Sequence, residues 1–104
     1  DRDKLRRILA AFATETRQDL ERWRQARASS DRAMLGLLAH RLRSACLTLG
    51  ADEAAQLLDA IEHDATDPAM ADPDFAATAD RASARVAALL ADIEHALGGL
   101  SSPA

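Results

Sequence analysis

The chain has 104 residues, the size of a single domain, and 48% of them are hydrophobic, which excludes general disorder. No apolar run is long enough to cross a bilayer. The net charge of −4 is unevenly divided, because residues 1–50 hold 11 Lys or Arg and 6 Asp or Glu, whereas residues 51–104 hold 2 and 11.

The first predicted helix spans residues 3–28. The side chains of its predicted buried stripe recur at spacings of three and four residues, which is typical of one helix face. They are Leu5, Ile8, Leu9, Phe12, Thr16, Leu20 and Trp23. The segment Ser-Ser-Asp then ends this helix, and Ser30 or Asp31 is expected to cap the second.

The second predicted helix spans residues 32–49 and ends at Gly50, because glycine readily adopts the left-handed conformation of a C-terminal cap. The third spans residues 53–63, with Asp52 as its expected cap. Its expected buried side consists of Ala54, Leu57, Leu58 and Ile61. A loop with two Asp-Pro steps follows.

The fourth predicted helix has Asp72 as its N-cap and Pro73 in its first turn, and it ends near Leu97, before Gly98 and Gly99. Its expected buried side consists of Phe75, Ala79, Ala82, Val86, Leu89, Leu90, Ile93 and Leu97. Nothing in the pattern indicates strands. We therefore predict an all-α, antiparallel up-down-up-down four-helix bundle over residues 1–97, and a tail or linker over residues 98–104.

A single histidine, His40, lies in the second predicted helix. Since a helix turns by about 100° per residue, His40 points about 200° away from Leu38, the centre of the predicted core face. That core face consists of Met34, Leu38, Leu42, Ala45 and Leu49. We therefore expect the His40 ring to face solvent.

The neighbours of His40 on this outward side suit the docking of a partner protein. Gly36 and Ser44 are small and are expected to leave the ring unobstructed, whereas Leu37 and Leu47 form an apolar rim. Arg43, three residues after His40, adds a positive charge.

Two other chemistries use the same residue types. His40, His63, His95 and Cys46 show none of the spacings of known metal sites, so we expect no bound metal. Cys46 lies at the edge of the predicted core, where a small buried side chain is more common than a reactive thiol.

Residues 39–51, AHRLRSACLTLGA, resemble the signature AHxLKGxxxxxGA of histidine phosphotransfer (HPt) domains. The matching residues are Ala39, His40, Leu42, Gly50 and Ala51. Arg43 replaces the usual lysine and Ser44 the usual glycine. The resemblance extends over about residues 5–97 and includes a glutamate, Glu62, near the end of the following helix.

The resemblance implies a phosphorelay carrier. His40 would accept a phosphoryl group from an aspartyl phosphate of a receiver domain and pass it to another receiver. Arg43 would stabilise the phosphoryl oxygens and steer the partner. Such a domain has no active site or cofactor of its own, because the receiver supplies the aspartate and the Mg²⁺.

The implied partners are receiver domains of a hybrid sensor histidine kinase or of a response regulator. Domains of this family occur alone or at the C-terminal end of hybrid sensor kinases, and the tail-like end of this chain favours the second arrangement. A non-phosphorylated module that binds a receiver or a helical partner stays open, because Arg43 and Ser44 depart from the signature. We expect a monomer without nucleic-acid or membrane contact. A cytoplasmic location fits the single cysteine.

Overall fold

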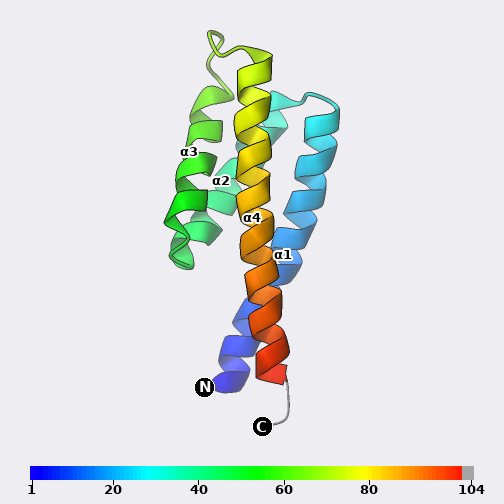
Figure 1. Ribbon diagram of the computed structural model, residues 1–104, viewed down its shortest axis with the longest axis vertical. Coiled ribbons are helices and arrows are strands. Elements are labelled where there is room, and N and C mark those ends of the chain that lie inside the picture. Colours follow the sequence, from blue (N-terminus) through cyan, green and yellow to red (C-terminus); the bar gives the residue numbers. More distant parts are fainter. Residues whose placement is uncertain (102–104) are drawn as a thin grey trace.

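The computed structural model describes residues 1–101; the last three residues of the predicted tail, 102–104, lie outside this part. Residues 1–101 form four helices and no strand (Figure 1). The helices are α1 (Arg2–Ala28), α2 (Arg32–Thr48), α3 (Asp52–Asp64) and α4 (Asp72–Ser101). The all-α prediction is therefore confirmed. None of these helices combines the length and the apolar content needed to cross a membrane.

The start of α2 follows the sequence closely. Of the two candidate caps, Asp31 is the one used, and its carboxylate accepts a hydrogen bond of 3.0 Å from the backbone N–H of Met34. After α2 the chain turns at Gly50, whose φ of +72° lies in the left-handed region that glycine adopts at little cost.

The ends of α3 and α4 differ from the predictions. Asp52 does not cap α3 but is its first residue, and Ala51 occupies the N-cap without a side-chain hydrogen bond. Asp72 is likewise the first residue of α4. Helix α4 does not end at Leu97 but continues through both glycines to Ser101. Packing against α1 supports this extra turn, and Arg2 Nη2 donates to the Gly99 carbonyl at 3.3 Å.

Helix α1 packs against α2 and α4, and α3 packs against the same two helices. Three polar contacts join α1 to α4 in reverse order of sequence, namely Arg2 with Gly99, Arg17 with Glu94, and Arg27 with Asp80. These two helices therefore run in opposite directions. The molecule is elongated, 54 × 23 × 17 Å, and α1 and α4 reach well beyond α2 and α3 (Figure 1).

The main hydrophobic core lies where all four helices are present, and Trp23, Leu38, Leu58 and Val86 are among its fully buried members. A smaller cluster around Ala13, Leu90 and Ile93 lies between α1 and α4, with Leu49 packed against it. Helix α2 thus ends beside the second cluster.

The buried face of α2 is rotated from the predicted one. Leu38 and Leu42 are buried as expected. Leu35, Ala39 and Cys46 are also buried, whereas Met34 is 40% exposed and Ala45 and Leu49 are only half-buried. The centre of the buried arc moves by about 50° from Leu38. The shift arises because α2 touches both α1 and α3 and is covered from two directions. Similarly, Ala55 rather than Leu57 completes the buried face of α3.

The predicted buried stripe of α1 is wrong at its beginning. Leu5 is 48% exposed and Ile8 is 52% exposed. They lie on the same side of α1 as its buried residues, but α2 does not extend far enough along α1 to bury them.

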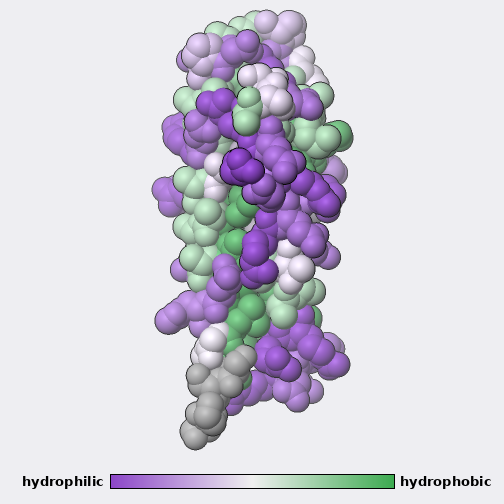
Figure 2. All heavy atoms as spheres, turned by 90° about the vertical axis from the view of Figure 1, so that its right-hand side faces the viewer, coloured by the Kyte–Doolittle hydropathy of each residue, from purple (hydrophilic) through white to green (hydrophobic). Residues whose placement is uncertain are grey.

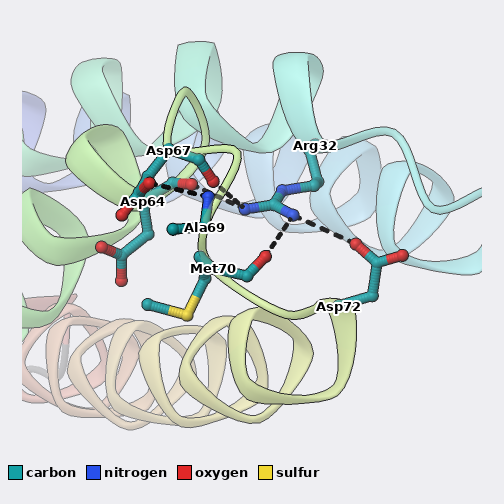
Figure 3. A network of polar contacts seen from close by, with 6 residues as sticks. All are labelled: Arg32, Asp64, Asp67, Ala69, Met70 and Asp72. Carbon is teal, nitrogen blue, oxygen red and sulfur yellow. Dashed lines mark hydrogen bonds and ion pairs between the residues drawn. The ribbon is translucent and has the colours of Figure 1, made fainter.

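Arg32, at the start of α2, fastens the loop between α3 and α4 (Figure 3). Its guanidinium donates to the backbone carbonyls of Asp64, Asp67 and Met70 at 2.7–3.3 Å and to the Asp72 carboxylate at 3.1 Å. It also lies over the Phe75 ring, 4.5 Å from its centroid. One side chain thereby holds the last residue of α3 beside α2.

Candidate functional site

His40 lies in the middle of α2, and its side chain is 65% exposed, although the preceding residue, Ala39, is completely buried. The rotation of the core face leaves His40 about 150° from the centre of the buried arc. The prediction that its ring faces solvent is confirmed.

The ring is held from α3. His40 Nδ1 lies 2.6 Å from Glu62 Oε1, and the Glu62 side chain is only 22% exposed. An ionised carboxylate can only accept, so this contact places the ring proton on Nδ1. The other nitrogen, Nε2, then carries a lone pair and no proton, which makes it the nucleophilic atom of the neutral ring.

Arg43 belongs to the same cluster but does not stand unpaired beside the ring. Its Nε lies 2.6 Å from Glu62 Oε2, and its Nη1 lies 3.6 Å from Asp59 Oδ1. Glu62 therefore contacts the histidine through one oxygen and the arginine through the other. The expected cation is present, but two carboxylates of α3 share its charge.

Gly36 has a different role from the expected one of leaving space beside the ring. A Cβ added to Gly36 would lie 2.9 Å from the Cβ of Ala65, at the end of α3. The missing side chain thus lets α3 approach α2 one helical turn from the pair His40–Glu62. Gly36 and Arg32 together bring the end of α3 close enough for Glu62 to reach the ring.

The apolar rim predicted around His40 is exposed. Leu37 is 64% exposed and Leu47 is 54% exposed, and Ser44 is exposed between them on the helix surface. The Ser44 hydroxyl is turned back toward its own helix and donates to the His40 carbonyl at 3.5 Å. Gly36 is half-buried, because α3 covers one side of it.

On the other side of α2, Arg41 is tied to α1. Its Nη2 lies 3.4 Å from Asp19 Oδ1, and Arg22 Nη1 lies 3.0 Å from the same oxygen. Asp19 is buried, so two arginines compensate its charge. The helix that carries His40 is therefore fastened to α1 by Arg41 and to α3 by Arg43.

Cys46 is buried in the core, as predicted, and burial raises the pKa of its thiol. The other two histidines, His63 and His95, are exposed. Within residues 1–101, no group of three or more His, Cys, Asp or Glu side chains is arranged to hold a metal ion.

Glu62 is the residue whose contact could not be derived from the helical pattern. Its position near the end of the third helix resembles the HPt pattern, but its partner depends on which side of α3 meets α2. Asp59 precedes it by three residues and so shares its face, which is the one signal in the sequence for a paired acidic site.

One of the comparisons with known proteins identifies a family. The family model of the Hpt domain matches residues 7–96, which is most of the chain. Neither the curated proteins nor the solved structures contain a significant match.

Proposed function

Since the chain belongs to the Hpt domain family, whose members are histidine phosphocarriers of two-component signalling, we propose that His40 is the phosphorylated residue. It accepts the phosphoryl group from an aspartyl phosphate of one receiver domain and passes it to the aspartate of another. The observation that carries this proposal is the pair His40–Glu62, because it joins an exposed imidazole to a fixed carboxylate.

The transfer step follows from the orientation of the ring. Nε2 attacks the phosphorus atom, a bond from Nε2 to phosphorus forms, and the bond from phosphorus to the aspartyl oxygen breaks. The aspartate leaves with the electron pair as a carboxylate. The Nδ1 proton stays on the ring, which therefore becomes positively charged, and Glu62 stabilises this charge through its 2.6 Å contact.

Arg43 acts on the phosphoryl group and on Glu62 together. Its Nε is engaged with Glu62, and the remainder of its planar fork carries positive charge next to the reacting side of α2. This charge stabilises the phosphoryl oxygens and attracts the acidic site of a receiver. The receiver supplies the aspartate and Mg²⁺, and this domain needs no cofactor.

The receiver docks on the exposed side of α2. Leu37 and Leu47 offer apolar contact on either side of His40, and Gly36 and Ser44 keep the surface low around the ring. The partners are receiver domains of a hybrid kinase or of response regulators. The fold that presents this surface is an antiparallel up-down-up-down bundle, as the reverse-order contacts between α1 and α4 support.

A second function rests on a specific observation. Arg43 contacts Glu62 and Asp59, which reduces its charge toward a phosphoryl group, whereas Leu37 and Leu47 are exposed and available for binding alone. A module that binds a receiver without accepting phosphate would use the same surface.

The two functions are separated by incubating the domain with phosphorylated receivers. We expect acid-labile phosphohistidine on the wild type and none on His40→Gln. His63→Gln is the matched control, because His63 is an exposed histidine on α3 and should leave labelling unchanged. Label that persists on His40→Gln would place the site elsewhere. Complex formation without label for every receiver would favour the binding module.

A further inference from the structure

Helices α1 and α4 extend beyond the part of the molecule in which all four helices are present. At about 1.5 Å per residue, the 27 residues of α1 span about 40 Å and the 17 residues of α2 about 25 Å. The 30 residues of α4 span about 45 Å and the 13 residues of α3 about 20 Å. The start of α1 and the end of α4 thus form a two-helix extension, residues 2–12 and 91–101 (Figure 1).

The apolar stripe of α1 continues along this extension. Eighteen residues make about five turns of a helix, so residues 18 apart point in the same direction. Leu5 therefore points as Trp23 does, and Ile8 as Ala26 does. Trp23 and Ala26 are buried within the four-helix part, whereas Leu5 and Ile8 are about half exposed.

The same relation holds for α4. Leu97 lies 18 residues after Ala79, and Leu100 lies 18 residues after Ala82. Both alanines are completely buried, whereas both leucines are only partly buried. On α4 the extension thus carries larger apolar side chains than the four-helix part does at these two equivalent positions, although α2 and α3 are absent there.

Figure 2 shows hydrophobic residues between hydrophilic ones in the lower part of the molecule, where α1 begins and α4 ends. A pair of helices with apolar stripes is half of a four-helix bundle, and a second pair of helices is needed to complete it.

We propose that a second copy of this chain supplies the missing pair. The two extensions pack face to face about a twofold axis perpendicular to the long axis of the bundle. Each extension then occupies, in the other copy, the space beyond the ends of α2 and α3. The product is one continuous bundle with the two His40 sites in its outer parts. From the sequence we expected a monomer, with Leu5 and Ile8 in its core. We propose a dimer instead because both side chains are exposed in the single chain.

The charges at the meeting ends are complementary. Residues 1–7 contain four basic and two acidic side chains. In the proposed dimer the start of α1 meets the end of α2 and the start of α3 of the second copy. Helix α2 has no basic residue in its last turn, where the free carbonyls carry partial negative charge. Helix α3 begins with Asp52 and with Glu53, which also pairs with Arg85 of its own chain at 2.5 Å. A basic segment therefore meets an acidic end.

The expected association is weak. Stable interfaces bury about 800 Å² and about 20–30 residues on each partner, whereas the extension consists of two segments of 11 residues that each offer one apolar side. Dimerisation should therefore depend on protein concentration and weaken with added salt, which screens the complementary charges.

Sedimentation equilibrium from micromolar to near-millimolar concentration tests the proposal. We expect the wild-type mass to rise from 11.1 kDa toward twice that value. The double variant Leu5→Asp, Ile8→Asp should stay monomeric at every concentration, with unchanged helical circular dichroism because both side chains are already exposed.

The matched control is Met34→Asp, Leu37→Asp, which places the same charges on two exposed apolar side chains near the start of α2, away from the proposed interface. This control should associate as the wild type does. A wild type that stays at 11.1 kDa throughout would overturn the proposal, as would association lost in the control and kept in the Leu5, Ile8 variant. Phosphohistidine formation does not enter this test, so its failure leaves the proposed function unaffected.

Discussion

Glu62 joins His40 and Arg43 through its two carboxylate oxygens, each 2.6 Å from a nitrogen of its partner. One side chain of α3 thus orients the exposed ring of α2 and holds the nearest cation. Removing this carboxylate should affect transfer more than it affects folding, because the site lies at the surface.

We expect Glu62→Ala to slow phosphorylation of His40 by about ten- to a hundredfold, since a charge-assisted hydrogen bond contributes about 1.5–3 kcal/mol. Glu62→Gln should fall between this variant and the wild type, because its amide oxygen still accepts from Nδ1–H but carries no charge. Rapid-quench labelling from a phosphorylated receiver measures both rates. Equal rates for the wild type and Glu62→Ala would show that the contact does not orient the ring.

Arg43→Ala should reduce the transfer rate, and Arg43→Lys should restore part of it. The lysine ammonium restores the positive charge near the phosphoryl group but cannot reproduce the planar fork that reaches Glu62 and Asp59. Arg24→Ala is the control, because Arg24 forms an exposed pair with Glu21 on α1. The same labelling assay applies, and a rate for Arg43→Ala equal to that of Arg24→Ala would remove the electrostatic role.

Gly36→Ala should destabilise the fold by about 1–3 kcal/mol, because the new methyl group would lie 2.9 Å from the Ala65 Cβ and push α3 away. The same movement should slow transfer by withdrawing Glu62 from His40. Gly98→Ala is the matched control within a helix, since its Cβ meets nothing within 4 Å. This change should raise the free energy of unfolding by about 0.5–1 kcal/mol. Urea unfolding of both variants measures the difference, and a stabilised Gly36→Ala would contradict the close packing.

The Cys46 thiol should react with a disulfide reagent only as fast as the protein opens, because it is buried and burial raises the pKa of this thiol. The folded state then retains the proton at a pH where the unfolded state, with its ordinary pKa of 9.0, loses it. Stability should therefore fall as the pH rises through and above that value. A thiol at the exposed position Thr48, as Thr48→Cys with Cys46→Ala, should react at once. Rapid reaction of wild-type Cys46 would contradict its burial.

Local sequence determined much of this protein. The period of 3.6 residues and the breaks at Asp31 and Gly50 are properties of the chain itself, so four helices and their approximate bounds follow from them. The outward direction of His40 also follows, because it depends only on the phase of one helix. These features need no knowledge of how the helices are placed.

Tertiary structure decided which residues of each helix face are buried and which neighbouring helix buries them. Leu5 and Ile8 have the phase of core residues but are exposed, because the length of α2 sets where the cover ends. Gly98 and Gly99 signal a helix end, yet α4 continues where α1 packs beside it. The contact of Glu62 with His40 joins residues 22 positions apart, and it depends on the close approach of α3 at Gly36. Helical periodicity describes one helix at a time, whereas these contacts depend on the distance and rotation between two.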